Sequence, residues 1–294
     1  MSFREHLARQ QQIIDRELER LVPAESTPPE TIHRAMRYSL FAGGKRVRPV
    51  LCMDTARAIS DAPRGIETAA CSLEFVHTYS LIHDDLPALD NDDYRRGKLT
   101  SHKVFGEAMA ILAGDALLTL AFETLSKMDA VRDDRKTRVI AELATAAGTV
   151  GGMIGGQVAD LEGEGKPPDA QLLESIHRAK TGALLRASVR MGAIYAGAGD
   201  EQLDAMSRYG EHVGLAFQIV DDILDVEQSS ESLGKTAGKD AQQKKITFPA
   251  VYGLEESRRM AESERLSAHR ALDMFGERGG RLRELADLIV QRKS

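Results

Sequence analysis

Two short acidic clusters are the residues of this sequence best placed to do chemistry. Each sets three aspartates among apolar, helix-prone residues: Asp84, Asp85 and Asp90 in LIHDDLPALD, and Asp221, Asp222 and Asp225 in FQIVDDILD. Because unpaired carboxylates are costly to bury, each cluster needs cations or solvent nearby. Hard divalent ions prefer carboxylate oxygens, so the two clusters predict facing sets of ligands around several such ions. That arrangement would hold a polyphosphate.

The second cluster has the spacing of one helical face. Asp221 and Asp225 are four residues apart, and on an α-helix they would point within about 40° of each other. Gln218, three residues before Asp221, falls on the same face, while the apolar residues between them can pack elsewhere. We therefore expect a polar stripe of two carboxylates and one amide.

The first cluster departs from this spacing. Asp84 and Asp90 are six residues apart, which is about 120° on an ideal helix. Pro87 lies between them, so we expect a kink or bulge that brings Asp90 back toward the metal side. The alternative is that residues 90–93 form an ordinary solvated acidic loop.

Basic segments offer cations for the same ligand. The segment GGKRVRP at 43–49 combines two glycines, which let backbone amides approach an anion, with three cations that form charge-assisted bonds. A surface turn is the alternative for this segment and for Arg95-Arg96-Gly97. His77, seven residues before Asp84, could equally be a core hydrogen-bonding group. Lys180 and Thr181 lie in a predicted helix of small apolar residues, where a buried lysine would need a nearby anion.

Composition and charge exclude several classes of protein. The 294 residues are 42% hydrophobic and 29% charged, which is typical of a globular protein with a substantial core. The net charge of -6 argues against non-specific nucleic-acid binding. Cys52 and Cys71 fit reduced core residues of a cytosolic protein better than a disulfide or a zinc site. No Walker A loop, Rossmann glycine fingerprint or Ser/Cys nucleophile motif occurs.

Helical periodicity dominates the chain, and no alternating strand pattern is convincing. The spacing predicts an all-α protein of roughly ten helices in a single domain covering residues 1–294. The helical runs include Glu5–Leu21, Glu67–Ile82, Ala108–Met128, Lys136–Ala159, Leu172–Ala196, Gln202–Val226 and Arg281–Arg292. The longest segment without a charge, Leu143–Ala159, is slightly short for a membrane span and rich in glycine, so we expect none. Its paired glycines indicate close helix packing or room for a ligand.

The motifs together resemble those of the trans-isoprenyl diphosphate synthases, and within them the bacterial farnesyl diphosphate synthases. The resemblance covers essentially the whole chain. It rests on GGKRVRP at 43–49, HTYSLIHDDLPALD at 77–90, RRG at 95–97, GGQVAD at 155–160, KT at 180–181, FQIVDDILD at 217–225 and GKTAGKD at 234–240. It implies one large helical bundle around a central cavity, formed by a single polyprenyl synthetase domain, in a cytoplasmic homodimer with a complete active site in each subunit.

The resemblance also implies roles for individual residues. The metal ligands would be both aspartate motifs, Asp84, Asp85, Asp90, Asp221, Asp222 and Asp225. Isopentenyl diphosphate would be bound by Lys45, Arg48, His77 and Arg96. The allylic diphosphate would be bound by Arg95, Lys180, Thr181, Gln218, Lys235 and Lys245, with Lys239 and Lys244 as alternatives to Lys245. Within that set, Lys180, Thr181 and Gln218 would be catalytic, because their charge and dipoles would stabilise an allylic cation.

The family's reaction is ionisation, condensation and proton loss. Roughly three Mg²⁺ ions per active site, with Mn²⁺ as a substitute, would draw the diphosphate off dimethylallyl or geranyl diphosphate. The double bond of isopentenyl diphosphate would then attack the cation, and the departed diphosphate would remove the proton. The partners implied are these three diphosphates, with no nucleic acid and no membrane span.

Two residues are candidates for control of product length. Tyr79 and Ser80 precede Asp84 by five and four residues, so they would lie roughly 6–8 Å deeper along a helix. In the resembling family an aromatic at the Tyr79 position accompanies a fifteen-carbon product, farnesyl diphosphate. The alternatives are a core tyrosine whose hydroxyl finds a partner, and a synthase of geranyl or geranylgeranyl diphosphate. A non-catalytic synthase subunit and an HD-type phosphohydrolase are the more distant alternatives.

Overall fold

A computed structural model describes residues 1–61, 63–167, 169–227 and 246–292. The chain divides into two compact units. The first unit comprises Met1–Val50 with Gly65–Arg132, and the second comprises Leu51–Arg64 with Asp133–Ser294. The prediction of one domain over 1–294 stays a prediction.

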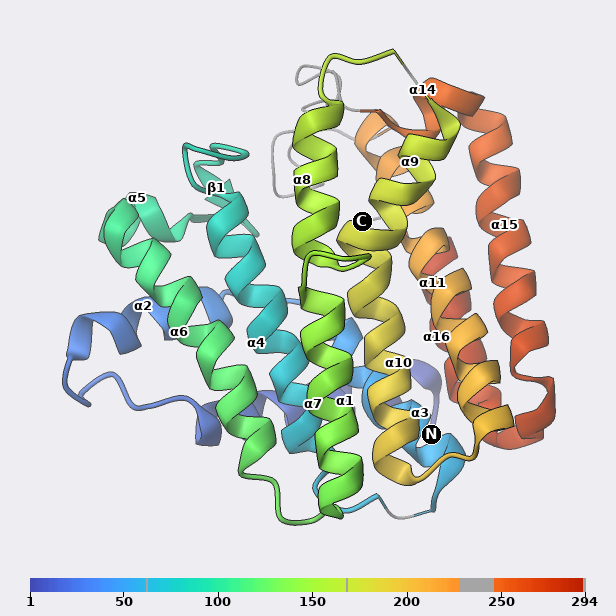
Figure 1. The fold of residues 1–294 in the computed structure, drawn as a ribbon, viewed down its shortest axis with the longest axis horizontal. Coiled ribbons are helices and arrows are strands. Elements are labelled where there is room, and N and C mark those ends of the chain that lie inside the picture. The colour runs from blue at the N-terminus through green and yellow to red at the C-terminus, as the bar shows by residue number, and fades with distance from the viewer. Residues whose placement is uncertain (62, 168, 228–245, 293–294) are drawn as a thin grey trace. The chain divides into compact units, whose positions relative to one another are not determined.

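The first unit is a set of helices around α4. Its elements are α1 (Phe3–Leu21), α2 (Glu30–Leu40), α4 (Ile66–Asp84), β1 (Tyr94–Arg95), β2 (Lys98–Leu99), α5 (Ser101–Phe105) and α6 (Glu107–Ser126). Twelve of the nineteen residues of α4 are buried, and α4 contacts α1, α2 and α6. Figure 1 shows α4 and α6 side by side. A helix that is apolar all round is a core helix, so α4 holds its site residues on a rigid support.

The second unit contains most of the remaining helices. They are α7 (Asp133–Ala147), α8 (Met153–Gly163), α9 (Ala170–His177), the π-helical turn η1 (Arg178–Gly182), α10 (Ala183–Ala196), α11 (Asp200–Glu227), α14 (Phe248–Tyr252), α15 (Leu254–Ala271), the 3-10 segment η2 (Asp273–Gly279) and α16 (Gly280–Gln291). The helix α3 (Val47–Ile59) contains the boundary between the units. A core cluster of Leu173, Ile219, Ile223 and Phe248 joins α9, α11 and α14.

Local sequence accounts for where several helices begin. Ser2 caps α1 in a capping box with Glu5. Asp169 accepts a hydrogen bond from the Leu172 amide at 2.7 Å and caps α9. The buried residues of α1 recur every four positions through Ile14 and Leu18, so one face of this amphipathic helix packs on the core.

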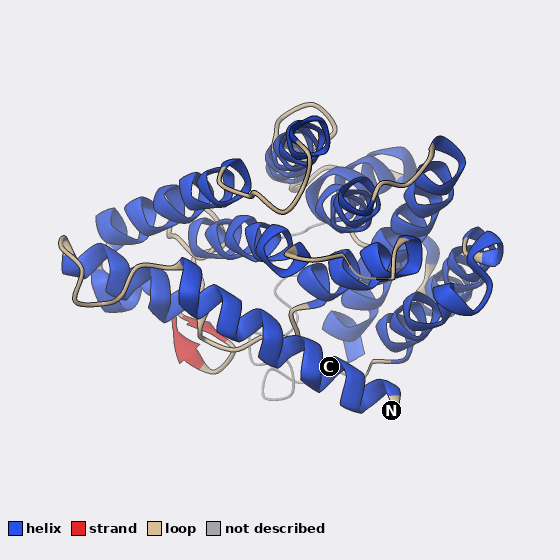
Figure 2. Cartoon of the chain, turned by 90° about the horizontal axis from the view of Figure 1, so that it is seen from below, coloured by secondary structure: helices blue, strands red, loops and turns tan. Residues whose placement is uncertain are grey.

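The fold class is confirmed as all-α. Within the described ranges the only strands are the two-residue β1 and β2, which Figure 2 shows as one small hairpin among helices. The predicted helix over Lys136–Ala159 is wrong, because the chain breaks between α7 and α8 at residues 148–152. Gly151 there has φ +65°, a left-handed conformation that ends a helix readily only at glycine.

Among the described residues, α6 is the one helix long and apolar enough to cross a membrane by length and composition. Its most apolar window is 39% buried. One such helix is weak evidence, since core helices of water-soluble proteins pass the same test. In the first unit α6 contacts α2, α4 and α5.

Candidate active site

The first aspartate motif lies where α4 ends. Asp84 is the last residue of α4, and the chain bends after it, as Pro87 predicted. The Asp90 amide donates to the Asp84 carbonyl at 2.8 Å, and the Asp92 amide donates to the Asp85 carbonyl at 3.2 Å. These bonds fold the loop back onto the helix end, so Asp84 and Asp90 are neighbours despite their spacing of six.

Asp85 turns toward a different group. It is 4% exposed, and its two carboxylate oxygens accept from Arg95 Nε at 2.8 and 3.0 Å, with Arg95 Nη2 at 2.6 Å from Oδ1. Burial raises the pKa of Asp85, and the bonds from Arg95 oppose that rise. Arg95 of the Arg95-Arg96-Gly97 motif therefore holds Asp85, while Asp84 and Asp90 are half-buried at the end of α4.

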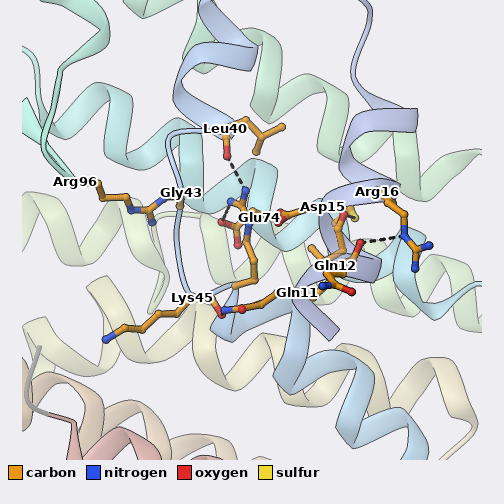
Figure 3. A network of polar contacts seen from close by, with 12 residues as sticks. Gln11, Gln12, Asp15, Arg16, Leu40, Gly43, Lys45, Glu74 and Arg96 are labelled. Carbon is orange, nitrogen blue, oxygen red and sulfur yellow. Dashed lines mark hydrogen bonds and ion pairs between the residues drawn. The ribbon is translucent and has the colours of Figure 1, made fainter. Parts of the chain in front are cut away.

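The GGKR loop lies beside Arg96 in the same unit. Arg96 donates to the Gly43 carbonyl, and a Cβ on Gly44 would lie 2.6 Å from its guanidinium (Figure 3). Gly44 also has φ +140°, so only glycine fits here without strain. Lys45 is exposed, whereas the next residue, Arg46, is buried. The segment thus combines one exposed cation with one that anchors the loop, a distinction that the sequence alone did not reveal.

His77 lies on α4, the helix that ends at Asp84. Burial lowers the pKa of His77 well below its ordinary value, and the positive charges of Arg48 and Arg96 lower it further. The imidazole is therefore neutral at pH 7, so at this position it can donate or accept one hydrogen bond but supplies no charge.

Tyr79 and Ser80 lie deeper on α4. Tyr79 is 6% exposed, and within the described part of the chain its hydroxyl has no hydrogen-bond partner, unlike the core tyrosine that we considered as an alternative. Burial, and secondarily the charge of Asp84, raises the pKa of Tyr79 to about 12. Its ring meets the His83 ring edge-on, with centroids 5.7 Å apart. Gly114 on α6 leaves room for His83, because a Cβ there would lie 2.2 Å from Nε2. The Ser80 hydroxyl donates to the His77 carbonyl at 2.9 Å.

In the second unit, a π-helical turn carries Lys180 and Thr181. This turn, η1, lies between α9 and α10, and such turns occur often at functional sites. Helix α8 approaches it closely at Gly156, where a Cβ would lie 2.1 Å from the Lys180 amide nitrogen. Lys180 Nζ donates to Asp160 Oδ2 at 2.6 Å. The anion that a half-buried Lys180 requires is therefore Asp160, one turn beyond Gly156.

The second aspartate motif lies near the end of α11, and its middle member is the most buried. Asp222 is 3% exposed and accepts from Gln218 Nε2 and from the Phe248 amide, both at 3.0 Å. His177 Nε2 is 3.4 Å from Asp222 Oδ2, and the His177 ring stacks on Phe248. Gln218, predicted to share a face with Asp221 and Asp225, bonds instead to Asp222. Asp222 thus links α9, α11 and α14 and fixes the orientation of the Gln218 amide.

Asp221 has a different partner. Arg292 Nη2 donates to Asp221 Oδ1 at 2.6 Å and to the Phe217 carbonyl at 2.9 Å, and its guanidinium lies 4.0 Å from the centre of the Phe217 ring. Asp221 is half-buried, and Asp225, one turn further along, is 7% exposed. Nothing in the periodicity of the sequence pointed to Arg292, since it follows the motif by 71 residues. Lys235, Lys239, Lys244 and Lys245 lie outside the described residues.

The carboxylates suit a divalent cation by donor type. In the described ranges no three Asp, Glu, His or Cys side chains already converge on one point. Mg²⁺ is commonly held by one or two carboxylates together with substrate phosphates rather than by a closed protein cage. Asp84 and Asp90 at the end of α4, and Asp221 on α11, offer oxygen donors of this kind.

The sequence profile of one family, Polyprenyl synthetase, matches residues 29–274. The chain belongs to the polyprenyl synthetase family. It is a trans-prenyl synthase, a prenyltransferase of a family that binds its diphosphates with divalent metal ions. Membership confirms the resemblance found in the sequence and argues against the HD-type phosphohydrolase alternative.

Relatives within the polyprenyl synthetase family differ in the product that they are named for. The chain is 45% identical to the farnesyl diphosphate synthase of Geobacillus stearothermophilus, over 99% of this chain and 98% of the relative. It is 46% identical to the large subunit 1 of the heterodimeric chloroplastic geranylgeranyl pyrophosphate synthase of Arabidopsis thaliana, over 99% and 80%. The apo crystal structure of an FPP/GFPP synthase from Zymomonas mobilis is similar, with a TM-score of 0.87 and 36% identity over 98% of each chain. Similarity therefore establishes the family and leaves the product open.

Proposed function

We propose that this prenyltransferase condenses isopentenyl diphosphate with dimethylallyl diphosphate and then with geranyl diphosphate to give farnesyl diphosphate. The observation that carries the fifteen-carbon product is Tyr79, a bulky buried side chain on the helix that ends at Asp84. A hydrocarbon tail does not hydrogen-bond, and a tyrosine whose hydroxyl has no partner is held there by packing rather than by a polar contact. Both facts support a role for Tyr79 as the floor of a tail pocket, with Ser80 beside it.

Isopentenyl diphosphate is assigned to the cations of the first unit. Lys45 is exposed, and Arg48 lies three residues later in α3. Arg96, already against the loop at Gly43, adds a third cation. Charge-assisted bonds from such a set suit a diphosphate. His77, neutral at pH 7, would contribute a hydrogen bond.

The allylic diphosphate is assigned to Arg95 and Lys180, with Lys235 and Lys245 by resemblance. Lys180 is held by Asp160, and this pair would orient its ammonium group before substrate arrives. The dipoles of Thr181 and Gln218 would stabilise positive charge as the allylic diphosphate leaves, and Asp222 would hold the Gln218 amide in one orientation. The departed diphosphate would accept the proton in the last step.

Mg²⁺ would be held by the aspartate motifs and would stabilise the negative charge of the leaving diphosphate. Asp84, Asp90, Asp221 and Asp225 are the first candidates. Asp85, Asp221 and Asp222 accept hydrogen bonds from protein groups, so these three would bind an ion through the lone pairs that remain on their oxygens. The homodimer and the cytoplasmic location also belong to this proposal, and the exposed Ile111 and Leu112 of α6 support a subunit contact.

The test is the identity of the product. The protein would be incubated with Mg²⁺, isopentenyl diphosphate and dimethylallyl diphosphate, and the dephosphorylated products separated by chromatography. Farnesol as the main product is expected. Geranylgeraniol or geraniol as the main product would contradict the chain length and support the alternatives, and no elongated product would contradict the synthase itself.

A further inference from the structure

The loop that carries Lys45 is held at three points within the first unit. On one side, Arg96 donates to the Gly43 carbonyl. On the other side, Gln11 Nε2 of α1 donates to the Lys45 carbonyl at 3.0 Å. The residue after Lys45, Arg46, has its side chain buried in the core. The exposed Lys45 side chain therefore projects from a backbone that is fixed on both sides.

Arg46 is the central anchor. Its Nη1 donates to Glu74 at 2.6 Å, its Nε to Asp15 of α1 at 2.9 Å, and its Nη2 to the Leu40 carbonyl at 2.9 Å. The side chains of Arg46 and Glu74 are each 3% exposed. Burial opposes the positive charge of Arg46, but the charges of Glu74 and then Asp15 outweigh it, so the pKa of Arg46 is raised. Arg46 also has φ +51°, which is uncommon for a residue with a side chain.

This backbone conformation determines where the neighbouring side chains lie. A residue in the left-handed region reverses the local direction of the chain. The three hydrogen bonds from the Arg46 guanidinium offset the free-energy cost of this conformation. Two of the groups that stabilise the turn, Gln11 and Asp15, lie one helical turn apart on α1. Neither belongs to the segment that the sequence identified as phosphate-binding.

We propose that Gln11 and Asp15 are positioning residues for isopentenyl diphosphate. Through the Lys45 carbonyl and the Arg46 guanidinium, α1 holds the loop in the one conformation that presents Lys45 and Arg48 to the diphosphate, without touching the substrate. This inference rests on the proposed function. It adds to the binding site a helix, α1, that lies outside all of the sequence motifs.

The adjacent Gln11 and Gln12 provide a matched pair for the test. Both are glutamines in the middle of α1, and within the described part of the chain only Gln11 of the two makes a hydrogen bond through its side chain. In Gln11→Ala we expect the KM for isopentenyl diphosphate to rise roughly three- to tenfold, the size of one lost hydrogen bond. The KM of Gln11→Ala for geranyl diphosphate and its melting temperature should equal those measured for Gln12→Ala.

A second pair of variants tests Asp15. Asp15→Ala removes the acceptor for Arg46 Nε and should raise the KM for isopentenyl diphosphate. Asp15→Asn keeps an oxygen acceptor there, so its KM should return most of the way to the wild-type value. An unchanged KM in an active Gln11→Ala enzyme, or an equal rise for both substrates, would overturn the inference alone. A wild-type protein that forms no elongated product would overturn the proposed function, and the inference with it.

Discussion

Gly156→Ala is the substitution whose effect on turnover the structure predicts most sharply. The new Cβ would lie 2.1 Å from the Lys180 amide nitrogen and 2.5 Å from the Lys180 Cα, both backbone atoms that cannot rotate away. Since ordinary contact begins at 3.4 Å, α8 and η1 would have to separate by about 1.3 Å, the difference between 3.4 and 2.1. The displaced segment carries Lys180 and Thr181, so the change acts directly on the proposed catalytic groups.

The expected loss is in turnover rather than in folding. A misplacement of about 1 Å in positioning groups costs on the order of a hundredfold in rate. Forcing a methyl group into a packed contact costs about 1–3 kcal/mol, and replacing a helical glycine by alanine returns about 1 kcal/mol. The net destabilisation of about 0–2 kcal/mol corresponds to a fall in melting temperature of at most several degrees.

The control lies in the same helix. In Gly163→Ala the nearest atoms are the side-chain Ile176 Cδ1 at 3.5 Å and Leu172 Cδ2 at 3.7 Å, which are ordinary contacts. Its kcat should equal that of the wild type. Steady-state kcat with saturating substrates and Mg²⁺, together with thermal unfolding, measures both effects. If folded Gly156→Ala kept a kcat within about threefold of the wild type, the proposed dependence of turnover on this contact would be refuted.

Three further outcomes are expected. Asp84→Ala and Asp221→Ala should each lower kcat by on the order of a hundredfold or more with little change in melting temperature; near-normal turnover at saturating Mg²⁺ would remove that residue from the ligand set. Tyr79→Ala should shift the main product from fifteen carbons to twenty or more, and an unchanged product on chromatography would leave Tyr79 as ordinary core. Burial raises the pKa of the Cys52 and Cys71 thiols, so iodoacetamide at pH 8 should label neither in the folded protein and both in denaturant; mass spectrometry showing rapid native labelling would contradict their burial.

The sequence predicted the features that depend on neighbouring residues. Helical periodicity identified the all-α class, and Pro87 correctly predicted the bend that folds Asp90 back to Asp84. The paired glycines before Val158 indicated close packing, and Gly156 does contact the Lys180 backbone. Each of these features follows from helical periodicity or from the restricted or free backbone of a proline or a glycine.

Features that depend on distant partners could not be predicted in this way. By spacing alone Gln218 could bond to Asp221 or to Asp222. It bonds to Asp222, whose carboxylate is held in the core by the Phe248 amide, 26 residues away in the sequence. The helix predicted across residues 148–152 fails because backbone conformation at glycines there overrides an apolar pattern. Arg46 and Arg48 look alike in the sequence, and bonds to distant groups, Glu74 of α4 and Asp15 of α1 among them, make Arg46 an internal anchor.

The π-helical turn η1 bears on how this enzyme can vary during evolution. An i→i+5 turn holds one residue more than an α-helical turn in an otherwise continuous helix. Deleting one residue of η1 would let it close as an ordinary α-helical turn, so α9 would keep its register with α10 and His177 would stay beside Asp222 and Phe248. A deletion in α9 itself would instead rotate everything upstream by about 100° relative to α10. Within Ala170–Ala196, η1 is therefore the place where a one-residue change of length would least disturb the packing of the flanking helices.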